Sequence, residues 1–442
     1  MPSLPETPLP DQSAQKSAHD ADVLIIGGGP AGSTLAALLA ARGKSAVVLE
    51  KDRHPRFHIG ESLLPFNVPL FERLGVLDEI RRIGMPKFGI EFVSPHHERP
   101  SLLEFAGSWH KEQDCAFQVR RSDFDLVLLR NASAKGARVF EECRVTEVAF
   151  PTGGGVCATS VDTDGATREW HARFLVDASG RDTFMAGRQN LKQRNKRHAS
   201  AAIFGHFTSA ERLPGRAAGN ISIFWFAKGW FWFIPLADGT TSIGAVCRPE
   251  TFKARESDVT AFLMELIATC PALAARLKNA ALTGPATGTG NYSYDCTSMV
   301  GDRYLMVGDA AGFIDPVFST GVYLAMHGAF VAADAVTTSL DQPARAASAL
   351  RDYERDCRKK LARFSWFIYR ITSPAIRGLF MAPRNYLRVE EAVLALLSGD
   401  VDARSPIRSR LLLFKLLYYF GTGFDKLRDA LLRPSAALRV RS

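Results

Sequence analysis

One segment near the amino terminus, residues 22–50, limits the possible folds of this chain more than any other. A short apolar run, Val23 to Ile26, stops at a cluster of glycines, and an Ala/Leu-rich stretch then leads to a second apolar run, Ala46 to Leu49. Short apolar runs on either side of a longer helix-forming stretch are typical of a strand, a helix and a second strand. We therefore expect a β-α-β unit at the start of the fold.

The glycines of this segment follow the pattern Gly27-x-Gly29-x-x-Gly32. The first permits a tight turn, the second lets the backbone approach a pyrophosphate, and the third lets helix and strand pack closely. The phosphates would then meet free N–H groups at the start of the helix. Glu50 ends the second strand, where a carboxylate can accept hydrogen bonds from an adenosine ribose. Strand, glycines, helix, strand and acid in this register predict a dinucleotide-binding site.

A second stretch, residues 304–322, could contact another part of the same dinucleotide. A short apolar strand is followed by Gly308-Asp309-Ala-Ala-Gly312, and a Ser-Thr-Gly turn at residues 319–321 then leads into a helix. A carboxylate directly after a strand can bind ribityl or ribose hydroxyls, and the start of a helix can face an anion. The turn at Asp177-Ala-Ser-Gly180 is equally consistent with a simple strand end and with a cofactor contact.

Composition indicates an ordinary globular protein. The chain has 442 residues, of which 46% are hydrophobic and 23% charged, and this length exceeds one compact core. Residues 1–20 are rich in proline and polar residues, so we expect a disordered tail rather than a signal peptide. The seven cysteines form no CxxC pair and no ligand spacing with histidine, so no metal site and no disulfide framework is expected. A reducing cytoplasm is the expected compartment.

The order of the predicted elements indicates an α/β protein of two domains with a helical extension. Residues 199–250 carry aromatic, β-rich runs typical of a second, sheet-based domain, after which the chain returns to the first. The expected divisions are a disordered tail at 1–20, a dinucleotide-binding domain at 21–195 and 286–340, a β-rich substrate domain at 196–285, and a helical basic region at 341–442.

Two further features have an ordinary structural interpretation when each is taken alone. Lys87 begins an alternating stretch, residues 87–93, in which it would share a face with every second residue. A lysine at the start of a strand is more often a solvated charge at a sheet edge. Alternation also places Trp230, Trp232 and Ile234 on one face of a strand, most simply as an aromatic stripe of the core.

Four motifs together resemble the FAD-dependent monooxygenase superfamily with a p-hydroxybenzoate-hydroxylase-like fold. They are GGGPAG at Gly27, VxRxxFD around Arg121, DASG at Asp177 and GDAA at Gly308, and the resemblance covers roughly residues 20–340. It implies a Rossmann-like FAD domain plus a β-sheet substrate domain. The residues that it assigns to FAD are Gly27, Gly29, Ala31, Gly32, Glu50, Lys51, Ser62, Arg121, Val145, Asp309, Gly321 and Val322.

Within that superfamily the chain resembles the flavin-dependent halogenases. Residues 230–235, Trp-Phe-Trp-Phe-Ile-Pro, fit their WxWxIP motif, and residues 87–93 resemble the segment that bears their essential lysine. The resemblance implies catalytic roles for Lys87, Trp230 and Trp232. Tryptophan halogenases have a glutamate before the Ser-Thr-Gly turn, whereas this chain has Phe318, which would line the substrate pocket. The chain is therefore closer to the branch that halogenates pyrroles and phenols, often on a carrier protein, and free tryptophan is not the expected substrate.

The resemblance also implies the chemistry. Reduced FAD from a separate flavin reductase, oxygen and chloride or bromide would give hypohalous acid, which Lys87 could bind or convert to a haloamine. Backbone N–H groups of Thr320 and Gly321, at the start of a helix, are the expected halide seat. A single-component aromatic hydroxylase, a geranylgeranyl-reductase-like reductase of isoprenoid double bonds and a catalytically silent flavoprotein with a basic docking tail remain alternatives.

The carboxyl-terminal segment, residues 403–442, carries most of the net charge of +9, with nine lysines and arginines against two aspartates. Its apolar decade, Leu411 to Phe420, contains Lys415 and is too short to span a bilayer, so we expect it to be buried against the body or to form a lid. The basic side chains beyond it would suit binding to an acidic carrier protein. They are equally consistent with a solvated basic tail, and less consistent with binding to an anionic membrane surface. No nucleic-acid partner is expected.

Overall fold

The computed structural model describes residues 20–195, 200–290, 293–383, 385–401 and 405–432. The tail expected at residues 1–20 lies outside this range except for its last residue, which begins the first strand. The described range also excludes Arg433, Arg439 and Arg441, which carry part of the expected charge of the carboxyl-terminal segment. The side chains of residues 424–432 lie outside it as well.

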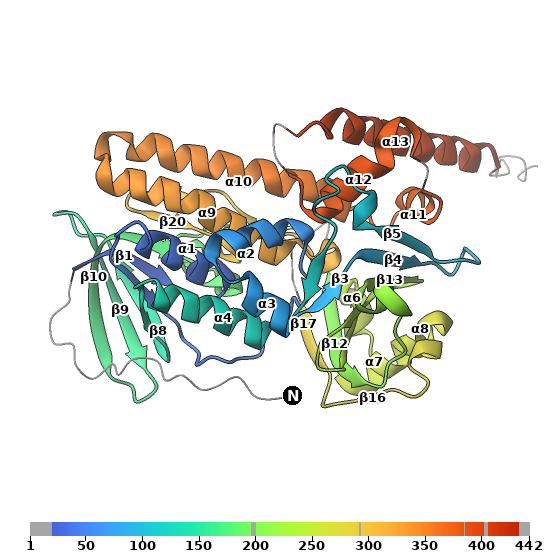
Figure 1. Ribbon diagram of the computed structural model, residues 1–442, viewed down its shortest axis with the longest axis horizontal. Helices are drawn as coiled ribbons and strands as arrows, with labels where there is room; N and C mark the ends of the chain where they lie inside the picture. Colours follow the sequence, from blue (N-terminus) through green and yellow to red (C-terminus); the bar gives the residue numbers. More distant parts are fainter. Residues whose placement is uncertain (1–19, 196–199, 291–292, 384, 402–404, 433–442) are drawn as a thin grey trace, which may run out of the picture.

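An eight-stranded sheet forms the centre of the first domain (Figure 1). Its strands run in the order β19-β20-β10-β1-β2-β7, and β9 and β8 continue antiparallel from β10. The pairs β20–β10, β10–β1, β1–β2 and β2–β7 are parallel, so their carboxyl ends meet at one edge. The bounds are β1 (Asp20–Ile26), β2 (Ala46–Leu49), β7 (Arg138–Phe140), β8 (Cys143–Ala149), β9 (Val156–Asp162), β10 (Thr167–Asp177), β19 (Val300–Gly301) and β20 (Tyr304–Met306).

Helices cover this sheet and bury the apolar sides of its central strands. Helix α1 packs between α4 and α9, and α10 lies against α9 (Figure 1). Val23, Ile25 and Val48 pack with α1 in the core and are fully buried. Strands that are covered on both faces are apolar throughout, which explains the continuous apolar runs in this part of the sequence. The bounds are α1 (Pro30–Ala40), α2 (Val68–Leu74), α3 (Leu77–Ile83), α4 (Arg121–Ala134), α5 (Phe184–Arg188), α9 (Thr320–Asp341) and α10 (Ala346–Ile368).

A second eight-stranded sheet forms the other domain, with the strand order β16-β12-β15-β14-β13-β4-β5 and β17 beside β12. One face packs on α6 (Pro249–Lys253), α7 (Val259–Ala268) and α8 (Pro271–Arg276), and the other joins the main core. Trp230, Trp232 and Ile234 share that second face, as their alternation predicts. The bounds are β4 (Gly89–Val93), β5 (Ser101–Glu104), β12 (Ala201–Thr208), β13 (Ile221–Phe226), β14 (Gly229–Pro235), β15 (Thr241–Cys247), β16 (Ala281–Leu282) and β17 (Thr287–Gly290).

The stretch at residues 87–93 is two strands rather than one. Lys87 ends β3 (Met85–Lys87), which pairs with β6 (Ala116–Gln118), whereas β4 joins the second sheet by pairing with β13 and β5. The expectation that Lys87 shares a face with alternate residues of this stretch is therefore wrong. It is also not a solvated edge charge, since only 1% of the residue is exposed. A third, small sheet contains β11 (Lys192–Arg194), β18 (Tyr294–Cys296) and β21 (Gly312–Phe313).

The carboxyl-terminal region is helical, with α11 (Pro374–Met381), α12 (Val389–Ser398) and α13 (Arg408–Leu432) beside the second sheet (Figure 1). In the apolar decade of α13 only Phe414 is buried, and Leu412 and Phe420 are 59% and 76% exposed. The expected burial of the whole decade is therefore wrong: Phe414 packs against Trp366 and Phe367 of α10, whereas five of the ten side chains of the decade are exposed. None of the described helices is long and apolar enough to cross a bilayer.

Candidate active site

A cavity of about 490 Å³ lies at the carboxyl edge of the first sheet, where the second sheet approaches it. The sheet register creates it, because Ile26 lies beside Leu49 and Asp177, and Asp177 beside Met306. The turns that follow these four strands all open onto one space, the usual ligand position in an open α/β sheet.

The glycine turn after β1 has the geometry that its sequence predicts. Gly27 has φ +100°, and a Cβ there would lie 2.4 Å from Ala178 O. A Cβ on Gly32 would lie 1.9 Å from Gly27 O, so only glycine allows α1 to approach the strand this closely. Gly29 and Ala31 line the cavity at the start of α1, where helix N–H groups favour an anion. Gly32 supports this turn from behind and is not itself on the cavity wall.

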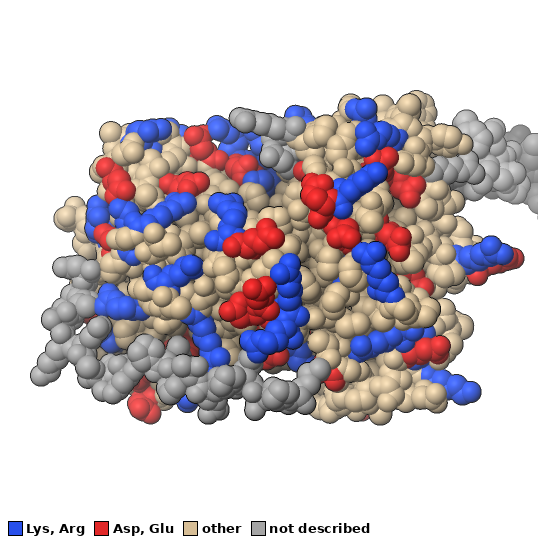
Figure 2. Space-filling model, in the orientation of Figure 1, with Lys and Arg blue, Asp and Glu red and all other residues tan. Residues whose placement is uncertain are grey.

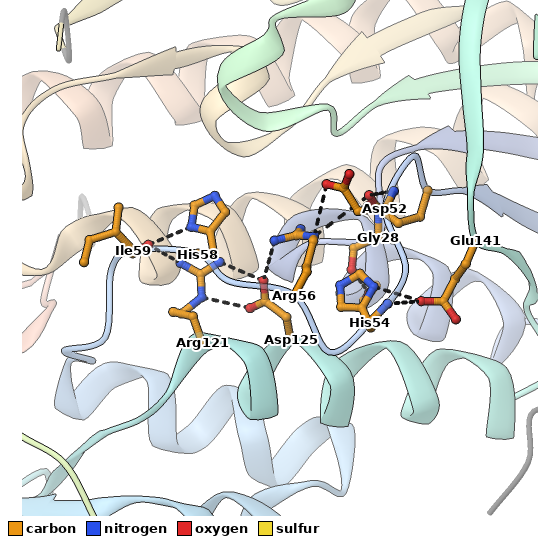
Figure 3. A network of polar contacts seen from close by, with 11 residues as sticks. Gly28, Asp52, His54, Arg56, His58, Ile59, Arg121, Asp125 and Glu141 are labelled. Carbon is orange, nitrogen blue, oxygen red and sulfur yellow. Dashed lines mark hydrogen bonds and ion pairs between the residues drawn. The ribbon is translucent and has the colours of Figure 1, made fainter. Parts of the chain in front are cut away.

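Glu50 lies on the cavity wall and is 3% exposed. Its Oε2 accepts from Gly28 N (2.6 Å) and its Oε1 from Asp52 N (2.9 Å), and Figure 3 labels these two donor residues. These bonds hold the carboxylate beside the glycine turn. Each oxygen can still accept a second hydrogen bond, so the acid can also serve a ribose.

Arg121 is held rigidly at another part of the wall (Figure 3). Its guanidinium donates to both carboxylate oxygens of Asp125 (2.8 and 3.0 Å) and to Ile59 O (2.8 Å). Burial alone would raise the pKa of Asp125, but Arg121 outweighs it and holds that pKa below its usual value. Arg121 and burial together lower the pKa of His58 to about 4, so this ring is neutral at physiological pH.

Two aspartates follow strands at this edge, and their carboxylates have different roles. Asp177 is fully buried and accepts from Ser179 N (2.9 Å) and Met185 N (2.7 Å), so its carboxylate shapes the turn. Ala178, Ser179 and Gly180 provide the wall instead. Asp309 lines the cavity directly, and burial raises its pKa to about 6 in spite of Arg121 and Arg181.

Helix α9 begins at the same edge, with its N-cap Ser319 in the left-handed conformation. Gly321 and Val322 line the cavity, whereas Thr320 lies on a smaller cavity of about 40 Å³ that Gly321 also borders. Phe318 is 4% exposed and is not among the described residues that line either of these two cavities. It packs edge-on against Phe380 of α11, with ring centroids 6.3 Å apart.

Lys87 lies immediately behind the wall. Its Nζ donates to Ser62 Oγ (2.9 Å), and Ser62 lines the cavity whereas Lys87 does not. The Nζ also lies 5.5 Å from the ring centre of Phe105. Burial lowers the pKa of Lys87 to about 7, because the ammonium form is desolvated, and the only titratable group that counters this is Cys115. The amine is therefore neutral in a large fraction of molecules at physiological pH.

Trp230 and Trp232 form the wall contributed by β14, together with Ile234. Trp232 Nε1 donates to Ser242 Oγ (3.1 Å), which fixes the indole. A Cβ on Gly244 of the neighbouring strand would lie 2.2 Å from the Trp232 ring, so glycine is needed opposite it. Of the other expected residues, Lys51 and Val145 also line the cavity, and Lys51 Nζ lies 2.5 Å from Asp182 Oδ2.

Sequence reasoning did not single out Glu61, which lines the cavity next to Ser62 and is 2% exposed. Its Oε1 lies 2.7 Å from His206 Nε2 of β12, and its Oε2 has no hydrogen-bond partner among the described residues. Arg181, from the turn after β10, also lines the cavity. Local sequence patterns do not identify Glu61, because its partner lies 145 residues further along the chain.

Comparisons with known proteins agree with this geometry. A family model described as an FAD binding domain matches residues 20–365. The chain is 30% identical to a 1H-pyrrole-2-carbonyl-[peptidyl-carrier protein] chlorinase of Pseudomonas fluorescens, over 87% of this chain and 90% of that one. It is 35% identical to the flavin-dependent halogenase armH1 of Armillaria mellea, over 72% of this chain and 65% of that one. The solved structure of the myxobacterial chondrochloren halogenase CndH superposes with a TM-score of 0.76 at 34% identity, covering 88% of this chain and 92% of that one.

Proposed function

The chain belongs to the flavin-dependent halogenases within the FAD-binding-domain family, and we propose that it halogenates a pyrrole-like or phenol-like ring held on an acyl or peptidyl carrier protein. It is an FAD-dependent oxidoreductase that uses halide, and the relatives do not favour the hydroxylase or reductase alternatives. The observation that carries the proposal is the buried, partly neutral Lys87, one hydrogen bond behind the wall of the FAD cavity.

The described residues fit FAD. The N–H groups at the start of α1 would hold the pyrophosphate, Glu50 the adenosine ribose, and Asp309 the ribityl hydroxyls, with Arg121 as the fixed cation beside them. When bound and reduced, FAD supplies, with oxygen, the oxidising power that turns halide into hypohalous acid. A single dinucleotide fingerprint supports a separate flavin reductase as the source of reduced FAD.

Lys87 would pass the halogen from the cavity to the substrate. Its neutral amine nitrogen attacks the halogen of hypohalous acid, the N–halogen bond forms as the halogen–oxygen bond breaks, and hydroxide leaves with one amine proton as water. The aromatic carbon then takes the halogen, and its own proton restores the amine. An ammonium ion has no lone pair for the first step and can only donate a hydrogen bond, so the lowered pKa favours the haloamine route.

Trp230 and Trp232 would keep the organic substrate away from the flavin. Both indoles are almost completely buried on the cavity wall, at 3% and 5% exposure, and one is anchored by Ser242. With the substrate excluded, halide is the species that meets the oxidant. Halide itself would lie near the start of α9, where Gly321 borders both cavities.

The residue type at position 318, and not a contact with the cavity, argues against free tryptophan as the substrate. Phe318, Phe380 and Phe92 form a continuous aromatic cluster, with ring centroids of Phe92 and Phe380 4.9 Å apart. No carboxylate stands at position 318 to pair with the ammonium group of a free amino acid. We therefore propose, from the residue type at position 318 alone, that free tryptophan is not the substrate.

Helix α13 supports presentation on a carrier protein. Leu412, Leu416 and Phe420 form an exposed apolar stripe, and Arg408 and Arg410 precede it on the same helix. The face in Figure 2 as a whole mixes lysines and arginines with acidic residues. An apolar stripe with basic neighbours suits an acidic partner, and one relative acts on a carrier-bound pyrrole.

All seven cysteines are free, which fits a reducing compartment, and we propose the cytoplasm as the place of action.

The substrate proposal is tested with a panel of free and carrier-bound aromatics, supplied with FAD, a flavin reductase, chloride or bromide and oxygen. Mass spectrometry should find halogen on a carrier-bound pyrrole or phenol and none on free tryptophan. Equal rates with the free and tethered forms of one ring would contradict the carrier role. Halogenation of tryptophan alone would contradict the ring type.

A further inference from the structure

The outer face of the β9–β10 hairpin brings together three side chains that the halogenase site does not use. Cys157 of β9 lies opposite His171 of β10, and Glu169 is two residues before His171 on the same strand. One donor atom from each, the thiol sulfur, a carboxylate oxygen and an imidazole nitrogen, lies within 4.8 Å of the other two. Glu169 and His171 are exposed, and Cys157 is half-buried. None of the three is among the described residues that line the FAD cavity.

The fold holds these residues in register. Trp170 and Ala158, on the opposite face of the hairpin, are buried in a core cluster, and Trp170 Nε1 donates to Ser160 Oγ (2.8 Å). A slip by one residue would move Trp170 into solvent, so the pairing of His171 with Cys157 is strongly specified. Ligands on paired strands are positioned more accurately than ligands on loops.

We propose that Cys157, Glu169 and His171 bind a zinc-class divalent cation, with water as the fourth ligand. Thiolate, imidazole and carboxylate are the three ligand types that zinc takes in proteins. A tetrahedral zinc with bonds of about 2.0–2.3 Å places its ligand atoms roughly 3.3–3.6 Å apart. The three donor atoms lie within 4.8 Å of one another, so they would have to approach by up to about 1.2–1.5 Å, within reach of side-chain rotations.

Charged side chains surround the three proposed ligands. Burial and the neighbouring Glu169 raise the pKa of the Cys157 thiol, so the metal must displace its proton. The register also places Glu147 of β8 and Arg173 of β10 on this face, and Arg173 is paired with Asp22 of β1 (2.8 Å).

A cation here would tie β9 to β10, the pair through which β8 joins the sheet. Since β8 carries Val145 on the cavity wall, the site would stiffen that edge from outside without touching FAD. The expected role is stabilisation of the hairpin, and it does not depend on the halogenase chemistry.

The test uses the full-length, FAD-loaded protein after treatment with a chelator. Zn²⁺ is titrated against a chromophoric competitor, and Co²⁺ is added separately to observe thiolate-to-metal charge transfer. We expect one equivalent of Zn²⁺, a thiolate–cobalt absorption band and a higher melting temperature with metal. Cys157→Ser and His171→Gln should each weaken Zn²⁺ binding on the order of tenfold or more.

Two variants serve as matched controls. Glu147→Gln removes a carboxylate from the same face, and Cys357→Ser removes a thiol elsewhere, and neither should change Zn²⁺ affinity. Retained FAD and an unchanged far-UV circular dichroism spectrum show that each variant is folded. The proposal is overturned if wild type binds Zn²⁺ no more tightly than Cys157→Ser, or if the cobalt complex shows no thiolate band.

Discussion

Replacing Lys87 by methionine should stabilise the protein at pH 6 and should do so less at pH 9. Methionine keeps most of the apolar length of the side chain and removes the amine, so little cavity is left. Burial lowers the pKa of Lys87 from 10.5 to about 7, a displacement that corresponds to roughly 5 kcal/mol of disfavoured charge at low pH. The lost bond to Ser62 offsets about 1 kcal/mol of the gain.

The direction of this pH dependence follows from the linkage between folding and the protonation of Lys87. Between pH 7 and 10.5 the unfolded lysine is protonated while the folded one is largely not, so wild-type stability rises with pH in this window. From pH 6 to pH 9 the cost of burying the amine falls by about 3 kcal/mol, whereas Lys87→Met carries no such cost.

The assay compares wild type and Lys87→Met in parallel thermal and urea unfolding at both pH values, with FAD saturating. Other titrating groups contribute equally to the two proteins, so they cancel in the difference between them. The reasoning is refuted if the advantage of the variant is the same at pH 6 and pH 9, since Lys87 would then titrate normally.

The remaining predictions concern the cofactor and the partner. Gly32→Ala should abolish FAD binding, because its Cβ would lie 1.9 Å from Gly27 O, whereas Gly187→Ala, with open space around it, should bind FAD normally in a fluorescence titration. Wild type should bind one FAD, and tight NADPH binding to the FAD-free protein would contradict the single dinucleotide site. Changing Arg433, Arg439 and Arg441 together to Glu should raise the apparent KM for a carrier-bound substrate several-fold at low salt, with flavin oxidation unchanged. An equal loss with a small free aromatic would leave this segment without a docking role.

The cofactor edge could be predicted from sequence because its requirements are local. Gly27, Gly32 and Glu50 occupy positions set by one turn and two short strands, and the structure has the predicted strand, turn and helix there. The shared face of Trp230 and Trp232 could also be predicted, because side chains two residues apart in a strand point to the same side of the sheet.

The surroundings of Lys87 could not be predicted in the same way. Its burial depends on β3 pairing with β6 and on contact with Ser62, partners 25 or more residues away in the chain. The buried Glu61–His206 pair was missed for the same reason, because it joins a loop to a distant strand. The exposed stripe of α13 differs from expectation because an apolar helix with too few neighbours cannot bury all of its sides.

The central claim, that Lys87 carries the halogen from the cavity to the substrate, is tested most directly by a halogen balance in Lys87→Met. Reduced FAD, oxygen and halide are supplied with a carrier-bound aromatic, and a small-molecule trap for free hypohalous acid is included in the same reaction. Halogenated carrier should disappear from the mass spectrum, while the trap should collect hypohalous acid at a rate equal to wild-type flavin turnover. Halogenated carrier at the wild-type rate, or loss of trapped hypohalous acid together with product, would contradict it.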